Sequence, residues 1–316
     1  MLTSLRKICR VQLLHYSAIL TYSTNSIITE LQMKDKEIDI LYKPFHWSNR
    51  KDVLKYHFDF IAKESKRSRE LIPSELNIPY GQRERQKIDI YGTDLPDSAP
   101  IFIFYHGGYW QQLCKEDSSF AAQSFYKHNI KTIVIGYSLC PEVTMYEMVK
   151  EIEQATSKCI EYAKKSGSRS IYMAGYSAGC HLIACLFANL FPSLSTEDHS
   201  LFKAAILCGG LYDITPVVLT NMNRKIQLTH NDALNLSPMF KNIPPLNFPV
   251  YVVISEYDSP AFKEQSKLYF NKIKPVCDVK FKIMQGCDHF NIVERMIHED
   301  YELVKLVSDI DKKITK

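Results

Sequence analysis

From about residue 80 onwards, short apolar segments alternate with longer segments of helical periodicity. Residues 101–105 are wholly apolar and residues 131–137 are rich in β-branched side chains, a pattern that predicts strands buried on both faces. Residues 170–174, 204–208 and 248–254 carry the same signal. Strands that alternate with helices form a mainly parallel, doubly wound sheet with helices on both faces. The sequence therefore predicts the α/β class.

The outer elements are predicted from their periodicity. Residues 86–91 alternate polar and apolar side chains, as a half-buried strand does, and residues 279–283 alternate in the same way, which indicates a strand near the sheet edge. One helix is expected to begin at Ser118 or Ser119 and to run to about His128. Further helices are expected over residues 145–166, ended by Gly167, and over residues 178–190 and 292–312.

The chain of 316 residues reads as one large domain with an extension. We expect an α/β domain over residues 39–316, in which the polar, proline-containing segment 213–247 forms a small cap. Residues 1–38 form an N-terminal extension. Its first 29 residues contain no acidic side chain but several basic ones, which fits a mitochondrial targeting helix. The alternatives are an unstructured tail or a start codon assigned too far upstream.

Composition excludes several classes of protein. The net charge is +4, from 39 basic and 35 acidic residues, which is too balanced to indicate nucleic acid or an acidic membrane as a partner. No apolar run approaches the length that spans a bilayer, so no stable membrane association is expected. The nine cysteines show neither a CxxC pair nor zinc-ligand spacing. We therefore expect reduced thiols, a cytoplasmic location and no metal or cofactor, and the sequence leaves a homodimer open.

The pentapeptide GYSAG follows the strand predicted at 170–174 and leads into an apolar helix. Without its structural setting, a G-x-S-x-G match is equally compatible with an ordinary glycine–serine turn and with a catalytic serine. In a strand–turn–helix setting it is typical of a nucleophile elbow, a sharp turn that exposes a serine hydroxyl at the carboxyl end of the sheet. The sequence thus predicts Ser177 as a nucleophile.

A serine nucleophile needs a histidine base and an acid that orients it, and in this arrangement they follow in the order serine, acid, histidine. His289 follows the last predicted strand, and Asp258 and Glu256 follow the strand before it. Asp258 is preferred because it lies further into its loop, where it can reach His289. Glu256 is the first rival, and Asp213, which more plausibly braces its own loop, is the second.

Two polar residues near these candidates are given no catalytic role. His181 lies one helical turn after Ser177, so it is expected to point into the core as a satisfied histidine. Asp288 is expected to face solvent or to form a turn.

The segment HGGYW follows the strand predicted at 101–105. Hydrolysis of an ester or amide creates an oxyanion that needs preorganised N–H donors, and adjacent glycines let a backbone present them. His106 is expected to brace this loop and Trp110 to pack it, although a plain strand-to-loop turn with core aromatics is the alternative. The predicted oxyanion hole comprises the backbone of Gly107, Gly108, Tyr109 and Ala178.

HGGYW followed by GYSAG resembles the α/β-hydrolase fold, in the branch shared by hormone-sensitive-lipase-type esterases and kynurenine formamidases. The segments YGQRERQKIDIYG, GYSLCPEVTM, YDITPV, LSP and SEYDSPAFKEQS are similar to stretches of the formamidases. The resemblance runs from about residue 39 to near the C-terminus. It implies that the family's triad falls on Ser177, Asp258 and His289, and its oxyanion loop on residues 106–110. Tyr176 and Cys180 are small variations that touch no catalytic role.

The resemblance implies hydrolysis of N-formyl-L-kynurenine to L-kynurenine and formate in tryptophan catabolism, through a formyl-enzyme intermediate. It leaves two alternatives. One is a general short-chain carboxylesterase that uses the same triad. The other, from a different class, is a non-catalytic member that keeps the fold for binding.

Overall fold

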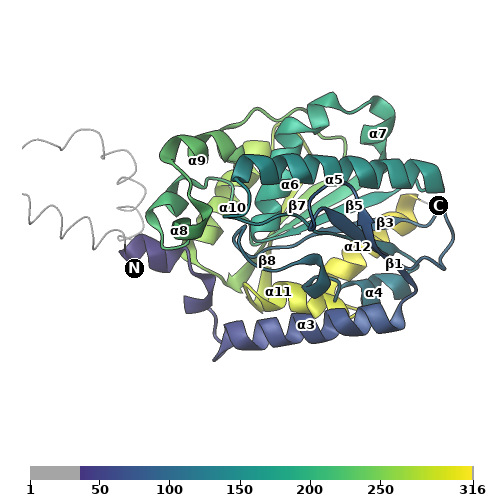
Figure 1. Cartoon of the computed structure of the whole chain (residues 1–316), viewed down its shortest axis with the longest axis horizontal. Helices are drawn as coiled ribbons and strands as arrows, with labels where there is room; N and C mark the ends of the chain where they lie inside the picture. Colours follow the sequence, from purple (N-terminus) through teal and green to yellow (C-terminus); the bar gives the residue numbers. More distant parts are fainter. Residues whose placement is uncertain (1–35, 315–316) are drawn as a thin grey trace, which may run out of the picture.

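The computed structural model describes residues 36–314, which form an eight-stranded sheet between two layers of helices (Figure 1). The strand order is β1-β2-β4-β3-β5-β6-β7-β8, and all neighbouring pairs from β4 to β8 are parallel. β1 and β2 extend one side in antiparallel fashion. The strands are β1 (Ser74–Pro79), β2 (Lys87–Tyr91), β3 (Ile101–Tyr105), β4 (Lys131–Ile135), β5 (Ile171–Tyr176), β6 (Phe202–Cys208), β7 (Val250–Tyr257) and β8 (Val279–Asp288).

Helices cover both faces of the sheet, α5 and α6 on one side and α3, α4 and α12 on the other (Figure 1). Strand β3 shows why both faces are apolar: Ile101 and Ile103 belong to one core, and Phe102 and Phe104 to the other. The helices are α3 (Val53–Leu71), α4 (Ala122–Lys127), α5 (Met145–Ser166), α6 (Ala178–Asn189), α7 (Thr196–Leu201), α8 (Asn223–Ile226), α9 (His230–Leu236), α10 (Pro260–Ile273), α11 (Asn291–Glu294) and α12 (Glu302–Ile314).

The predicted mainly parallel α/β sheet is confirmed, and so are several of its details. β8 lies at the sheet edge. Helix α5 ends at Gly167, whose φ of 75° is the left-handed conformation expected of a terminating glycine. At its other end, Thr144 and Glu147 form a reciprocal pair of cap hydrogen bonds.

Two helix predictions are wrong. Helix α4 begins at Ala122 without a side-chain cap, because the Ser119 hydroxyl donates to the Ser65 carbonyl (3.3 Å) and the Ser118 hydroxyl to the Cys114 carbonyl (2.7 Å). The helix predicted over 292–312 is broken into α11, a 3-10 turn at Arg295–Ile297, and α12.

Helix α3 is absent from the sequence-based predictions although it is 19 residues long. Its buried face includes His57, Glu64, Ser65 and Ser68 beside the apolar Val53 and Ile61. A helix that buries polar side chains shows no apolar stripe, so periodicity does not reveal it.

The segment that precedes α3 lies across the carboxyl ends of the strands. Its Asp39 carboxylate accepts a hydrogen bond from the Asn221 N–H (2.8 Å), within the predicted cap. The carbonyl of Tyr42 accepts from the Tyr109 hydroxyl. This entry segment, residues 36–47, thus joins the cap to the HGGYW loop. The division of the chain at residue 38 stays a prediction, and the targeting prediction lies outside the described residues.

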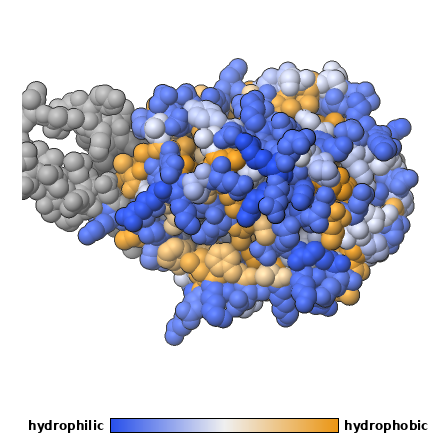
Figure 2. Space-filling model, viewed as in Figure 1, coloured by the Kyte–Doolittle hydropathy of each residue, from blue (hydrophilic) through white to orange (hydrophobic). Residues whose placement is uncertain are grey.

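The visible face of the molecule is mainly hydrophilic, with small hydrophobic patches between the polar side chains (Figure 2). Within residues 36–314, none of the helices has both the length and the apolar composition to cross a membrane.

Candidate active site

Ser177 lies at the junction of β5 and α6 with φ of 52° and ψ of −115°, a conformation that side-chain-bearing residues rarely adopt. Only glycine fits at the second residue before Ser177 and at the second residue after it. A Cβ on Gly179 would stand 2.0 Å from the carbonyl oxygen of Tyr105, and one on Gly175 would stand 2.7 Å from the Cys180 nitrogen. Close packing of the turn against the end of β3 therefore explains Gly179, and close packing against the first turn of α6 explains Gly175.

His289 directly follows β8, and Asp258 directly follows β7, so adjacent parallel strands bring the two side chains together. Nδ1 of His289 lies 2.9 Å from Oδ2 of Asp258, whose Oδ1 accepts from the Ser259 N–H at 2.7 Å. Both side chains are almost fully buried. Asp258 therefore fixes the tautomer in which Nε2 of His289 carries the lone pair.

Ser177 and His289 line the same cavity. No hydrogen bond joins the Ser177 hydroxyl to His289 within residues 36–314. In an unliganded site this is common, because catalytic hydrogen bonds tighten only when substrate is bound. The geometry thus contains a strained serine and an oriented imidazole that face one space.

The two rival acids are engaged elsewhere. Glu256 accepts the Gly286 N–H at 2.8 Å, which stabilises the bend in β8. Asp213 accepts from the N–H of Thr215 (2.9 Å) and from its hydroxyl (2.6 Å), so it braces its own loop. Among these candidates, Asp258 is the one that contacts His289.

The HGGYW loop packs directly on the serine turn. A Cβ on Gly107 would lie 3.1 Å from the Ser177 Cβ. Gly108 has φ of 102°, and Tyr109 and Trp110 also have positive φ. These backbone conformations do not occur in regular helices or strands, so the N–H groups of the three residues do not take part in helix or sheet hydrogen bonding. Within the described chain, the N–H groups of Gly107, Gly108, Tyr109 and Ala178 have no recorded acceptor. Free N–H groups beside a nucleophile are what an oxyanion site requires.

Neighbouring side chains hold this loop in place. His106 donates through Nδ1 to the Gly107 carbonyl (2.8 Å) and stacks on Tyr137, with ring centroids 4.1 Å apart. Burial lowers the pKa of His106 to about 4, so its ring stays neutral. Trp110 is fully buried and donates to Nδ1 of His181 at 3.2 Å. The Nε2 of His181 contacts the Leu236 carbonyl at 2.8 Å, so His181 is a satisfied core histidine, as predicted.

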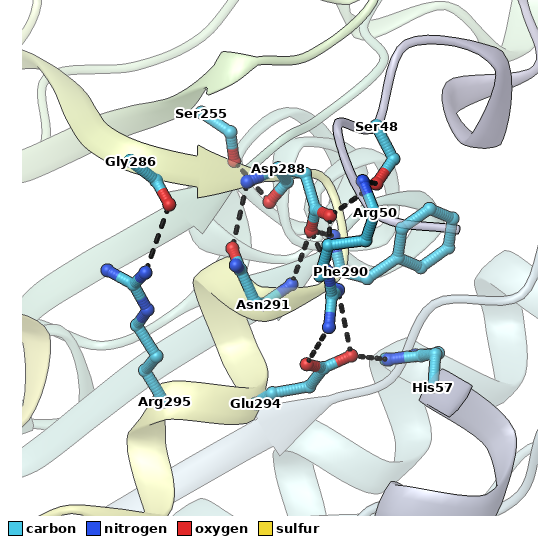
Figure 3. A network of polar contacts seen from close by, with 10 residues as sticks. All are labelled: Ser48, Arg50, His57, Ser255, Gly286, Asp288, Phe290, Asn291, Glu294 and Arg295. Carbon is cyan, nitrogen blue, oxygen red and sulfur yellow. Dashed lines mark hydrogen bonds and ion pairs between the residues drawn. The ribbon is translucent and has the colours of Figure 1, made fainter. Parts of the chain in front are cut away.

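Of the two alternatives predicted for Asp288, exposure to solvent is wrong, because the side chain is buried, and the role in a turn is confirmed. Two nitrogens of Arg50 donate to its carboxylate, at 2.7 and 2.9 Å (Figure 3). Burial raises the pKa of Asp288, but hydrogen bonds from Arg50, from the Asn291 N–H and from Ser48 outweigh that effect and hold the pKa below its usual value. Asp288 also forms a turn, since it accepts the N–H groups of Phe290 and Asn291.

The guanidinium of Arg50 bridges two carboxylates, because it also donates to Glu294 at 2.8 Å. Glu294 in turn contacts Nδ1 of His57 at 2.8 Å (Figure 3). This Arg50 network, consisting of Arg50, Asp288, Glu294 and His57, joins helix α3 to the end of β8, directly beside His289.

The cavity at the serine has a volume of about 180 Å³. The loop before α3 and the first turns of α3 supply much of its wall, which sequence reasoning did not identify. Its lining residues are Lys43, Pro44, Phe45, Leu54, His57, Phe58, Gly108, Tyr109, Gln111, Gln112, Leu113, Tyr176, Ser177, Met222, His289 and Phe290. A wider depression of about 430 Å³ between Arg83 and Lys241 is lined largely by polar side chains and contains none of the candidate site residues.

The arrangement has the parts of a serine hydrolase. It combines a strained serine hydroxyl, an imidazole oriented by a carboxylate, and backbone N–H groups beside the serine, which are the groups that serine hydrolases use. Within the described part of the chain, no cluster of three or more His, Cys, Asp or Glu side chains is arranged to hold a metal ion.

Comparison with known proteins gives consistent results, although no family model matches the chain. The kynurenine formamidase of Salmo salar is 32% identical over 287 residues, which cover 87% of this chain and 96% of that protein. The kynurenine formamidase of Danio rerio is 31% identical over 286 residues, with the same coverage. The crystal structure of a proposed thioesterase from Silicibacter sp. aligns with a TM-score of 0.74 at 25% identity, over 86% of this chain and 99% of that one.

Proposed function

The chain belongs to the kynurenine formamidase family, and from that premise we propose that Ser177, His289 and Asp258 hydrolyse N-formyl-L-kynurenine to L-kynurenine and formate. This reaction belongs to tryptophan catabolism, and the fold is that of the α/β-hydrolases. The observation that supports the assignment of the residues is the contact of 2.9 Å between Asp258 and His289, in the cavity that a strained Ser177 also lines.

In the first half of the reaction, the Ser177 oxygen attacks the formyl carbon while Nε2 of His289 takes the hydroxyl proton. The carbonyl oxygen becomes an oxyanion, which the N–H groups of the HGGYW loop and of Ala178 receive. Asp258 stabilises the imidazolium that forms, and burial of the pair strengthens that interaction.

In the second half, the bond between the formyl carbon and the aryl nitrogen breaks. His289 donates its proton to that nitrogen, so the aromatic amine leaves neutral and Ser177 carries a formyl ester. A water molecule then attacks the ester and gives its proton to His289. The bond between the formyl carbon and the Ser177 oxygen breaks, and His289 returns its proton to that oxygen. Formic acid departs and ionises to formate, and the site returns to its starting state.

The lining of the cavity suits the formyl group and the aryl ring of this substrate. A formyl group needs little room, which agrees with the bulky Tyr109 and Tyr176 beside the serine. Aromatic walls from Phe45 and Phe290 suit an aryl ring. Lys43 is the one lysine or arginine among the lining residues, and its ammonium group pairs with the Asp39 carboxylate. We propose that the substrate carboxylate also contacts this ammonium group.

A general esterase that acts on short acyl groups is the second candidate, since ester cleavage uses the same groups. The deciding assay compares kcat/KM for N-formyl-L-kynurenine with that for p-nitrophenyl acetate, in the purified protein and in Ser177→Ala. We expect the formamide to be the better substrate and the variant to lose both activities. Turnover of the ester alone would overturn the formamidase proposal.

A non-catalytic binding protein would differ in its reaction with an active-site label. We expect a fluorophosphonate to modify Ser177 in the native protein, and a peptide map to find the label on the GYSAG peptide. Absence of labelling in folded protein would favour the binding function instead.

The proposed location is the cytoplasm. The eight cysteines in the described part of the chain are all free thiols, a state that a reducing compartment maintains.

A further inference from the structure

His57 is a second imidazole in the catalytic cavity, and the reaction described above does not use it. It is only 2% exposed and lines the cavity together with Ser177 and His289. Its ring lies between the rings of Phe290 (5.1 Å between centroids) and Tyr176 (6.0 Å). A histidine buried in this way is held in one orientation.

Glu294 determines which nitrogen of His57 carries hydrogen. The Glu294 carboxylate lies 2.8 Å from Nδ1, so in the neutral ring the hydrogen is on Nδ1 and the lone pair is on Nε2. Within residues 36–314, Nε2 of His57 has no recorded hydrogen-bond partner. The remaining nitrogen of the ring is therefore an acceptor that is free for a ligand in the cavity.

The charges behind the ring favour a positively charged ligand. One guanidinium, Arg50, faces two carboxylates, Asp288 and Glu294, and both carboxylates are buried (Figure 3). With His57 neutral, the Arg50 network carries one uncompensated negative charge. Because burial weakens solvent screening, that charge acts on whatever contacts Nε2.

We propose that Nε2 of His57 accepts a hydrogen bond from the α-ammonium group of the substrate. This inference rests on the proposed function, because it identifies where that substrate's amino-acid end lies. Lys43, whose ammonium group is also paired with Asp39, then lies at the carboxylate end of the substrate, and His57 lies at its ammonium end. His57 thus contributes to recognition of an amino acid, whereas His289 moves the protons.

Two substitutions distinguish the role of Nε2 of His57 from that of Nδ1. In His57→Asn the side-chain amide can still donate to Glu294 from near the Nδ1 position, but the Nε2 acceptor is lost. In His57→Gln the amide oxygen reaches the Nε2 position. The matched control is His46→Asn, since His46 is exposed and does not line the cavity.

The substrates are N-formyl-L-kynurenine and its desamino analogue, 4-(2-formamidophenyl)-4-oxobutanoate, which lacks only the ammonium group. We expect His57→Asn to raise KM for the natural substrate about tenfold, the value of one hydrogen bond to a charged group. KM for the analogue should change less than about twofold, and kcat should stay within about threefold for both. His57→Gln should recover part of the lost affinity.

Three results would overturn the inference. The first is that the native protein has equal KM values for the two formamides. The second is that His57→Asn raises KM equally for both. The third is that His57→Asn lowers kcat as much as loss of a catalytic base would. Thermal melting checks that the variants fold. If they do not fold, the comparison of KM for the two formamides in the native protein still tests the inference. Turnover of p-nitrophenyl acetate without turnover of either formamide would refute the proposed function rather than the role of His57.

Discussion

Replacement of Gly107 by alanine tests whether the HGGYW loop binds the oxyanion. The new methyl group would lie 2.9 Å from the carbonyl oxygen of Tyr176 and 3.1 Å from the Ser177 Cβ. Ordinary contacts between such atoms begin at about 3.4 Å, so the loop must move away from the serine turn by about 0.5 Å to relieve the closer contact. Because φ of Gly107 is not in the left-handed region, the backbone itself accepts alanine.

A displacement of that size lengthens and misaligns the hydrogen bonds that the loop donates to the oxyanion. Loss of one such donor costs about 3 kcal/mol of transition-state stabilisation, or about 10²–10³ in kcat. We expect Gly107→Ala to lower kcat on N-formyl-L-kynurenine by this factor while KM changes little, because the ground-state carbonyl depends less on these donors. Overpacking should also lower the free energy of unfolding by about 1–3 kcal/mol, measured by urea denaturation.

The matched control is Gly167→Ala, at the C-terminus of α5. A Cβ there meets nothing within 4 Å, but φ is 75°, so alanine is strained. This variant should lose about 1 kcal/mol of stability and keep its kcat. The reasoning fails if Gly107→Ala retains kcat within about twofold, or if the control loses as much activity.

Three further predictions concern the charged residues. Asp258→Asn should lower kcat by about 10⁴, because His289 loses its tautomer, whereas Glu256→Gln should stay within a few-fold in the same steady-state assay; equal losses would show that the acid is misassigned. Lys43→Met should raise KM for N-formyl-L-kynurenine about tenfold, and Lys43→Arg should restore part of it, which initial rates measure; an unchanged KM would remove Lys43 from substrate binding. Arg50→Met should lower the free energy of unfolding by about 3 kcal/mol at neutral pH, since it leaves the buried carboxylate of Asp288 unpaired. The native pKa of Asp288 is held below its usual value, so the stabilisation is complete above about pH 4 and declines as the pH falls through the native pKa. Urea titrations at several pH values should therefore show that the difference in free energy of unfolding between Arg50→Met and the native protein becomes smaller in acid. A difference that does not change with pH would contradict the role of the Asp288 charge.

The sheet and the serine turn were predictable because their signals are local. An apolar strand such as β3 is recognised from five consecutive residues, and the turn at Ser177 from its flanking glycines. The order of strands along the chain then limits the choice of acid and base. The structure brings Asp258 and His289 together as that order predicts, while their catalytic roles await the assays above.

The rest of the site depends on contacts between distant parts of the chain. Asp288 is buried because Arg50, 238 residues away, neutralises it, and no pattern around Asp288 indicates this partner. His57 lies on a helix whose buried face is partly polar, so neither the helix nor its exposure to the cavity shows in the periodicity. Interactions of this kind are tertiary, and a single sequence does not reveal them.

Part of the cavity wall and the reacting groups have separate origins in the chain. Lys43, Phe45 and His57 come from the stretch before the first strand, whereas the serine, acid and base follow β5, β7 and β8. Mutations of Lys43 and Phe45, which lie outside the Arg50 network, can therefore change which acylated amines are admitted while the serine, acid and base keep their positions. An engineer who wishes to change the substrate preference of this hydrolase should therefore begin with the lining residues that lie ahead of the sheet.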